Sequence, residues 1–360
     1  MQSAKTEWIG DWITPKNLLV CILIVPVLLI PFFYKGGAAL LPMHLVIMVA
    51  SYIVLAQTWN ILSGLTGMFS LGHATFYGLG GYALAVAMVK LKLNPLVGLA
   101  AGIVLSAFFG LLLGAISSRL TGFFFTISTI ALAQVIRTIA MQWTPVTNSI
   151  TGLKIFRPIV SRMTFFYLSI AMAVAVSIFF AYLRRSRTGS MFVAIRENIN
   201  LARSLGVDVV RYKTISSVIA AMIASVVGSF ITYYIQVVDP NYLSPIISEK
   251  IIMVSIIGGM GYAWGPIFGS VLILLEEFIR GTLGARYAPL ASTLYGVILI
   301  VFMLFRPKGI VSINLKRSFG MAIAALTPSK DVNASVGPNP ENLGAGGGST
   351  LHASQFSKEK

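Results

Sequence analysis

Charged residues are scarce in this chain of 360 residues. Only 11% of the residues are Asp, Glu, Lys or Arg, whereas 56% are hydrophobic. A soluble globular protein carries about 25% charged residues, so this chain has too little polar surface to cover a water-soluble fold. The shortage excludes a soluble globular domain and indicates a polytopic membrane protein built from α-helices.

Acidic residues are rarer than basic ones: the chain has 11 Asp and Glu and 27 Lys and Arg, which gives a net charge of +16. The basic residues fall in loops and tails between apolar runs, which is typical of cytoplasmic loops and of contact with anionic lipid. No nucleic-acid partner is expected. Residues 43–183 contain no Asp or Glu. Because ion-coupled transport usually leaves acids inside the spans, this absence disfavours an ion-gradient-driven secondary transporter or channel, which stays open as an alternative.

Residues for catalysis or metal binding are also missing. The one cysteine, Cys21, has no partner for an internal disulfide, and the three histidines are widely spaced. There is no G-x-S-x-G nucleophile motif and no G-x-x-x-x-G-K-[ST] phosphate loop. We therefore expect no catalytic, cofactor-binding or metal-binding residues and no enzyme activity. If ATP drives this protein, another chain hydrolyses it.

Long apolar segments dominate the rest of the chain. A helical crossing of the bilayer needs about 20 apolar residues. Eight or nine segments approach this length: 18–33, 43–62, 69–89, 95–117, 122–141, 163–183, 214–238, 251–278 and 290–305. We expect one transmembrane domain over residues 1–326, in which some segments are broken or re-entrant. Residues 327–360 are rich in Pro, Gly, Ser and Asn, which predicts a disordered tail.

The charges in the loops predict the orientation. Seven basic and two acidic residues lie within 184–213, whereas the loop 239–250 holds two acids and one lysine. The first loop should therefore be cytoplasmic, the second external and the N-terminus cytoplasmic. Basic residues after 305 place the C-terminus inside too, provided that 251–280 enters from outside and returns there. A straight crossing with an external tail is the alternative.

Two glycine-rich stretches interrupt the apolar pattern: "SGLTGMFSLGHATFYGLGGY" (63–82) and "GGMGYAWGPIFGS" (258–270). Discontinuous helices in corresponding positions point to a transport pathway. The candidate pathway residues are Gly64, Gly67, Ser70, His73, Gly258, Gly259 and Gly261. Close helix packing is the alternative role for the glycines, and a structural hydrogen bond is the alternative for the histidine.

Two finer expectations concern the second stretch. Gly261, Gly265 and Gly269 recur every four residues and should form a stripe on one helix face. Glu276 and Glu277 follow it. Adjacent side chains point about 100° apart on a helix and cannot both line one site, so these two acids should cap the external end of a half-helix. Burial in the membrane is the alternative.

The segment 186–213, "SRTGSMFVAIRENINLARSLGVDVVRYK", is the one long polar stretch between apolar runs. Apolar residues at three- and four-residue spacing predict an amphipathic helix from Met191 to Leu205, opened by Gly189 and Ser190 and closed by a left-handed Gly206. About fifteen residues is marginal for a free helix, so the helix should be docked. A helix lying on anionic lipid is the alternative.

This segment resembles the cytoplasmic loop of bacterial branched-chain amino acid ABC transporter permeases of the Liv type. Eight positions keep the loop's usual pattern: Gly189, Ala194, Ile195, Arg196, Glu197, Ala202, Gly206 and Lys213. Four other segments are similar to the same family in the same order: "GLTGMFSLGHATFYGLGGY", "FTISTIALAQVIRTIAMQWTPVTNSITGL", "IIGGMGYAWGPIFGS" and "RPKGI". The resemblance covers about residues 41–310.

The resemblance implies a bacterial inner-membrane permease that works with a second homologous permease, two ABC ATPase subunits and a periplasmic substrate-binding protein. The loop would be the helix that couples the permease to the ATPase. Its coupling residues would be Gly189, Ala194, Arg196, Glu197, Ala202, Arg203 and Gly206. Phe192, Asn200-Leu201 and the external "TNSITGL" depart from the family pattern. Urea and short-chain amide permeases are closely related, so the substrate stays open.

Overall fold

The computed structural model describes residues 40–117, 120, 122–156 and 161–283, together with 293, 296, 297, 300 and 304. All of them belong to the compact unit Met1–Ile313. The expected segment 18–33, most of 290–305 and the expected tail 327–360 lie outside the described residues.

Five apolar stretches are long enough to cross a membrane, which confirms the expected class of all-α membrane protein. They lie on α3 (Leu40–Trp59), α5 (Pro95–Ser117), α6 (Phe123–Gln142), α8 (Arg162–Arg185) and α11 (Val209–Ile235). On α3 the apolar stretch continues through a π-helical turn, η3 (Asn60–Leu65). A shorter apolar helix, α4 (Ala74–Val89), accompanies them.

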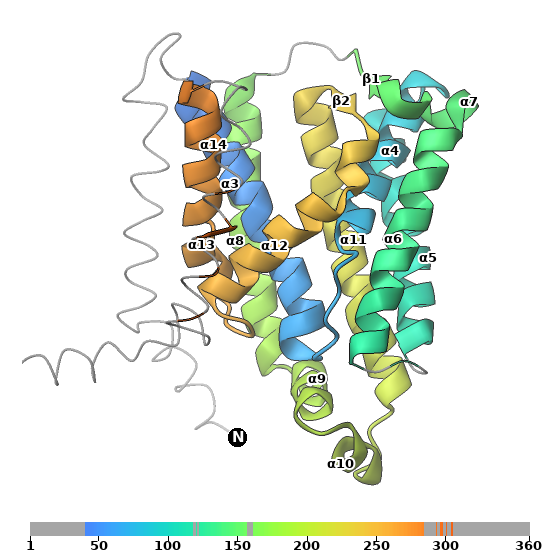
Figure 1. Cartoon of the computed structure of the whole chain (residues 1–360), viewed down its shortest axis with the longest axis vertical. Helices are drawn as coiled ribbons and strands as arrows, with labels where there is room; N and C mark the ends of the chain where they lie inside the picture. Colours follow the sequence, from blue (N-terminus) through green and yellow to red (C-terminus); the bar gives the residue numbers. More distant parts are fainter. Residues whose placement is uncertain are drawn as a thin grey trace, which may run out of the picture. The chain divides into compact units, whose positions relative to one another are not determined.

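The remaining elements are short. They are α7 (Thr144–Thr147), η4 (Ser149–Thr151), β1 (Leu153–Lys154), α9 (Arg187–Glu197), α10 (Ile199–Ser204), β2 (Val237–Val238), η5 (Pro240–Leu243), α12 (Pro245–Gly258), α13 (Gly265–Gly269) and α14 (Val271–Leu283). The two strands pair antiparallel, with Leu153 opposite Val238. The strands and α7 lie at one end of the helices, and α9 and α10 project at the other end (Figure 1).

Both expected helix breaks are present. The π-turn ends at Leu65, residues 66–73 are not helical, and α4 begins only at Ala74, five residues after the expected start of that segment. The second break separates α12, which ends at Gly258, from α13 and α14. Helix α12 runs obliquely, and α14 returns toward the end that carries α7 and β2 (Figure 1). This course is the one expected of a re-entrant pair.

Small residues bring α4, α5 and α11 close together. A side chain at Gly228 of α11 would overlap the carbonyl oxygen of Tyr77, and one at Gly80 of α4 would overlap that of Ser225. Helices that pack in lipid approach each other through such positions, because dispersion contacts replace the hydrophobic effect there. The interface therefore fixes α4, which follows the first break, against a full-length helix.

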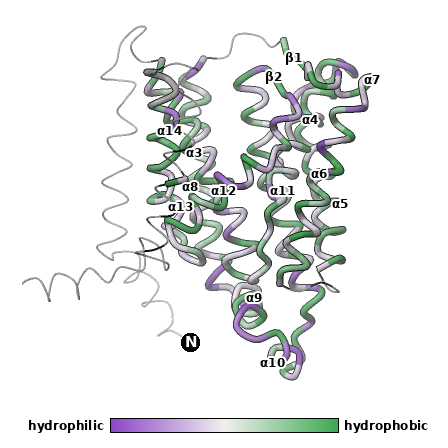
Figure 2. Tube along the Cα trace, in the orientation of Figure 1, coloured by the Kyte–Doolittle hydropathy of each residue, from purple (hydrophilic) through white to green (hydrophobic). Residues whose placement is uncertain are grey.

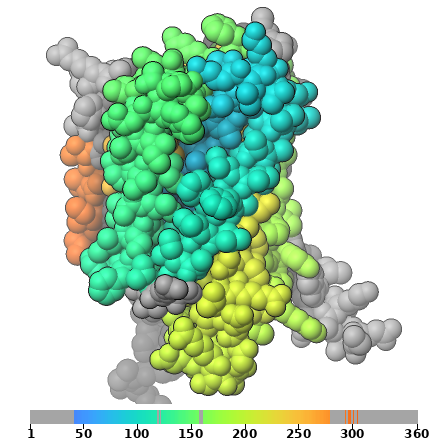
Figure 3. All heavy atoms as spheres, turned by 90° about the vertical axis from the view of Figure 1, so that its right-hand side faces the viewer, coloured from blue at the N-terminus to red at the C-terminus, as the bar shows by residue number. Residues whose placement is uncertain are grey.

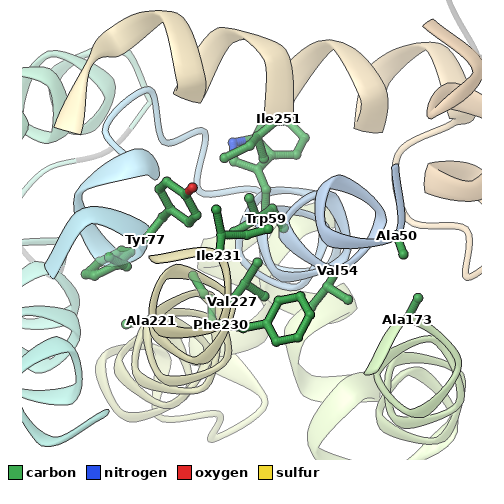
Figure 4. Close-up of a cluster of buried hydrophobic side chains, with 14 of the residues drawn as sticks. Ala50, Val54, Trp59, Tyr77, Ala173, Ala221, Val227, Phe230, Ile231 and Ile251 are labelled. Atoms are coloured by element: carbon green, nitrogen blue, oxygen red, sulfur yellow. The ribbon is translucent and has the colours of Figure 1, made fainter. Parts of the chain in front are cut away.

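A buried apolar cluster surrounds the breaks. Trp59 at the end of α3, Tyr77 of α4, Phe230 of α11 and Ile251 of α12 belong to it, and Figure 4 shows their side chains converging between these helices. Trp59 and Ile251 are fully buried. Most residues of the first break are therefore buried, although Gly67 and Phe69 are exposed, and Met260 and Tyr262 are exposed in the second. Irregular backbone at membrane depth is tolerated where protein packs around it.

The outward faces of α5, α6 and α8 are apolar. Exposed large side chains include Phe108, Phe124 and Ile178, and Figure 2 colours these helices mainly white to green. Figure 3 shows the face formed by α5 and α6, below which the segment around α10 projects. Such faces suit hydrocarbon or another membrane subunit, whereas the projecting segment suits water.

The close helix approach can be tested with Gly228→Ala. Both this variant and the control Gly102→Ala gain about 1 kcal/mol of helix propensity. At Gly102 the nearest atom is 3.2 Å from the added carbon, so the control fits with a small shift. At Gly228 the overlap should lower the free energy of unfolding by about 2 kcal/mol. Unfolding in detergent measures both, and equal stabilities would contradict the packing described.

Candidate functional site

The first break is held in place by hydrogen bonds to its backbone. The Ser63 hydroxyl donates to the Met68 carbonyl at 2.8 Å, and the Trp59 indole N–H donates to the Ser70 carbonyl at 2.8 Å. From the other side, the Leu71 amide donates to the Thr129 hydroxyl of α6 at 3.1 Å. Because no water reaches hydrocarbon depth, these bonds let residues 66–73 cross it without a helix.

Amide side chains on the same apolar helix join the first break to the second. Asn60 Oδ1 accepts from the Gly261 amide at 2.6 Å, and Asn60 Nδ2 donates to the Tyr262 carbonyl at 3.1 Å. Gln57 Nε2 donates to the Ala263 carbonyl. A side chain at Gly64 would overlap Asn60 Oδ1, so this glycine leaves the room that the amide needs. Asn60 and Gly64 both belong to the π-turn η3, and π-turns are frequent at functional sites.

Backbone conformation explains the glycines at the turns. Gly67, Gly259 and Gly261 have φ angles of 73°, 118° and 78°, which residues with a β-carbon rarely adopt. The predicted stripe of Gly261, Gly265 and Gly269 is wrong, because Gly261 lies in the turn before α13. Gly258 and Gly269 instead let α12 and α13 touch: a side chain at either would overlap backbone of the other helix.

His73 is fully buried at the start of α4. Its Nε2 lies 2.8 Å from the hydroxyl of Thr58, which itself donates to the Leu55 carbonyl, so the ring donates this bond. Its Nδ1 and the Ser70 hydroxyl are buried without a hydrogen-bond partner in the described part of the chain. The contact with α3 fits the structural role that was the alternative for this histidine.

The polar segment forms two helices rather than the single predicted one. Asn198 has extended backbone, and its side chain accepts the amides of Asn200 and Leu201 at 3.0 Å. Asparagine competes with the helix in this way, which ends α9 and opens α10. Ser186, not Gly189 or Ser190, caps the start of α9 by accepting the Gly189 amide at 3.1 Å.

The predicted end of the segment is confirmed. Gly206 has a φ of 81°. Its amide donates to the Arg203 carbonyl at 2.9 Å, and the Val207 amide donates to the Ala202 carbonyl at 3.0 Å. These two bonds are the Schellman motif, which needs a left-handed residue at this position.

Packing divides the segment into an inner and an outer surface. Phe192, Ile195 and Ala202 are buried, and Ala194 is half-buried. A side chain at Gly189 would overlap the Leu183 carbonyl.

Leu205, which the helical pattern placed on the docked face, is instead 74% exposed, and Leu201 is 59% exposed. Arg203 and Glu197 are exposed as well. The outer surface of α10, defined by Leu201 and Arg203 together with Leu205 at the C-cap, therefore has no cover from the described residues.

Arg196 turns inward and brings the two groups of predicted residues together. Its Nη1 donates to the Gly64 carbonyl at 2.6 Å. Its Nη2 and Nε donate to Glu197 Oε1 at 2.5 and 3.1 Å. A side chain at Gly67 would come within 3.0 Å of Arg196 Cγ, and one at Gly261 within 3.2 Å of its Nη1. The guanidinium thus sits against both breaks.

Two further basic residues anchor the ends of the polar segment. The guanidinium of Arg184, in the last turn of α8, lies 5.2 Å from the ring centre of Tyr262 in the second break, within cation–π range. At the other end, Lys213 is buried, and its Nζ donates to the Ser117 carbonyl at the end of α5 at 3.4 Å.

Several of these polar residues were missed from the sequence. Gln57 and Asn60 are amide side chains within the apolar run 43–62. A polar side chain in the middle of such a run was the signal that could have identified them. Arg137 in α6 is a second case: it is half-buried, and its Nε has no hydrogen-bond partner within the described residues. Ionisable and amide side chains at membrane depth are functional candidates for this reason.

The expected capping role of Glu276 is wrong. This residue is 3% exposed, and its Oε1 pairs with Lys250 Nζ at 2.5 Å. The pair joins α12 to α14 across the second break. Burial deprives both groups of water, and the hydrogen-bonded contact between them offsets part of that cost, which explains how an acid can lie in the interior.

The apolar helices, the two joined breaks and the projecting polar segment define a multi-pass membrane transport protein. The chain belongs to the family described as "Branched-chain amino acid transport system / permease component", which matches residues 41–303. Its members are permease components of transport systems and not enzymes.

Curated relatives agree with the family. The chain is 26% identical over 352 residues to the high-affinity branched-chain amino acid transport system permease protein LivM of Salmonella typhimurium, covering 87% of this chain and 79% of that one. It is 24% identical to LivM of Escherichia coli, covering 84% and 76%. It is 22% identical to BraD of Pseudomonas aeruginosa, a protein of the same description, covering 73% and 92%. No solved structure matches the chain.

The amide bridge between the breaks can be tested with Asn60→Ala. The change leaves the Gly261 amide and the Tyr262 carbonyl without partners, at about 1–3 kcal/mol each. The Gly261 amide should therefore exchange with deuterium about tenfold faster or more. Asn200→Ala, at an exposed position of α10, is the control. Unchanged exchange at Gly261 in Asn60→Ala would show that the bridge does not hold the second break.

Proposed function

We propose that this chain is one of two related permease subunits of an ATP-driven, binding-protein-dependent importer of branched-chain amino acids. The observation that carries this proposal is the projecting segment. Its inner surface packs on the chain's own helices. Leu201 and Arg203 of α10, with Leu205 at its C-cap, are exposed at the far end of the segment. An apolar residue pair beside a cation suits a protein partner better than water.

The partner for this outer surface is an ABC ATPase subunit, two of which serve the pair of permeases. The chain holds no phosphate loop of its own, so the work of ATP must reach it through a contact. Among the coupling residues, Gly189 fits the segment closely to α8, and Ala194 packs against the cluster that contains Ala202. Gly206 closes the tip, and Arg203 offers charge-assisted hydrogen bonds.

The orientation follows from this assignment. The concentration of basic residues around α9 and α10 supports a position of these helices in the bacterial cytoplasm, beneath the inner membrane, with both termini on the same side. The opposite end, with α7, β1 and β2, would then receive the periplasmic binding protein (Figure 1). We assign the permease domain to residues 1–326; the expected tail 327–360 lies outside the described residues.

The substrate would pass near the two breaks. Six of the candidate pathway residues are buried there: Gly64, Ser70, His73, Gly258, Gly259 and Gly261. Gly67 belongs to the first break too but is exposed, beside Arg196. Interrupted helices supply backbone groups that can pair with a polar solute. Within the first break, the Ser70 hydroxyl and His73 Nδ1 are buried without a partner among the described residues. The relatives' names support branched-chain amino acids, and urea or a short-chain amide is the alternative within the family.

An ion-gradient-driven transporter remains the competing class. It requires an acid that binds and releases an ion inside the membrane. Of the acids in α12 and α14, Glu276 is paired with Lys250, and residues 43–183 contain none. This distribution favours work supplied from outside the chain.

The docking surface can be tested with Leu205→Asp. A carboxylate in place of the leucine should lower the amount of ATPase that co-purifies about tenfold or more, because it removes apolar contact and buries a charge. Leu96→Asp is the matched control: Leu96 is 70% exposed against 74% for Leu205, and it lies at the opposite end of the helices.

Quantified ATPase in affinity-purified complexes measures this prediction. The control should retain the wild-type amount of ATPase. Equal retention by both variants would show that α10 is not the docking surface.

A further inference from the structure

We propose that Arg196 is a positioning residue that transmits movement of the coupling segment to both interrupted helices at once. This inference rests on the proposed function, since it assumes that an ATPase moves α9 and α10. It differs from the role that the family resemblance implies for this arginine, which is a contact with the ATPase itself.

The first step is the bond between Arg196 Nη1 and the Gly64 carbonyl, at 2.6 Å. Gly64 lies in the last turn of the π-helix, where backbone carbonyls have no partner within the helix and carry partial negative charge. A guanidinium donor at this place makes a charge-assisted bond, which is stronger than a neutral one. It joins residues 132 positions apart in the chain.

The second step is the passage from Gly64 to the second break. Gly261 donates to Asn60, in the same π-turn as Gly64, and a side chain at Gly261 would come within 3.2 Å of Arg196 Nη1. Arg184 lies over the ring of Tyr262, next to Gly261. The segment therefore bonds the first break through Arg196, whose guanidinium also lies beside Gly261. Arg184 of α8 contacts the second break at Tyr262, and Asn60 ties the breaks to each other.

The third step is the orientation of the guanidinium. Glu197 Oε1 accepts hydrogen bonds from Nη2 and Nε of Arg196, which leaves Nη1 directed at the Gly64 carbonyl. Only a planar fork of donors can serve both acceptors, and a lysine has a single point of charge. The Arg196 side chain is 36% exposed and that of Glu197 is 67% exposed, so the pair lies where the inner surface of the segment meets water.

Mechanical coupling follows from this arrangement. Ser186 and Asp208 cap the helices that enter and leave the segment, and these cap positions can absorb changes in backbone angle. A shift of α9 would carry Gly64 and residues 259–264 with it as one body. Non-helical backbone deforms at lower cost than intact helix, so the breaks are the places where such a shift changes the pathway.

The test uses the assembled transporter in vesicles, with leucine as substrate, and compares leucine taken up per ATP hydrolysed. Arg196→Ala should lower this ratio about tenfold or more, because a charge-assisted bond to a buried carbonyl is lost. Arg196→Lys should lower it too, since the fork is lost while the charge stays. Arg211→Ala, which removes an exposed arginine in the first turn of α11, is the control and should leave the ratio unchanged.

A second pair of variants reaches the relay without changing the arginine. Gly67→Ala places a methyl group 3.0 Å from Arg196 Cγ at a left-handed position, and Asn60→Ala breaks the link between the breaks. Each should lower the ratio. If Arg196 and Asn60 act in one relay, the double variant Arg196→Ala/Asn60→Ala should have about the same ratio as whichever single variant lowers the ratio more.

The outcomes separate the two proposals. A wild-type complex that takes up no leucine with ATP overturns the proposed function and this inference with it. A working wild type with an unchanged ratio in Arg196→Ala, or in Arg196→Lys if the alanine variant does not assemble, overturns the inference alone. Additive losses in the double variant would also overturn the relay, because independent sites add.

Discussion

Peptide groups buried at membrane depth must find their hydrogen-bond partners within the protein, and the rest of this structure depends on that constraint. The non-helical residues 66–73 are possible only because Ser63, Trp59 and Thr129 satisfy their backbone. The turn 259–264 is possible because Gln57 and Asn60 satisfy it in the same way. One apolar helix, α3 with its π-turn, therefore supports both breaks and makes them a single unit.

The projecting segment 186–213 and the end of α8 before it connect to this unit through basic side chains. Arg196 bonds Gly64, and Arg184 lies over Tyr262. A segment with an inward surface of this kind and a bare outer tip can receive a partner on one side and move the membrane helices on the other. The division of the segment at Asn198 serves the same end, because α9 holds the inner contacts and α10 presents Leu201 and Leu205.

Local patterns predicted the parts of the fold that depend on local chemistry. Apolar length found the spans on α5, α6, α8 and α11, glycine density found both breaks, and spacing found the cap at Gly206. Contacts between distant segments were out of reach: nothing near Arg196 in the chain indicates Gly64, and nothing near Glu276 indicates Lys250. The same limit explains the errors at Asn198, whose side chain competes with a helix that its neighbours favour, and at Gly261, whose four-residue spacing hides a turn.

Uptake of leucine into vesicles tests the central claim, that a separate ATPase drives this permease through its coupling segment. The vesicles would hold the chain with its sister permease, the ATPases and the binding protein, with ionophores present to collapse ion gradients. The account predicts uptake that requires ATP and the ATPase subunits and that persists without any gradient. Uptake by the chain without ATPase subunits, driven by an imposed ion gradient, would contradict it.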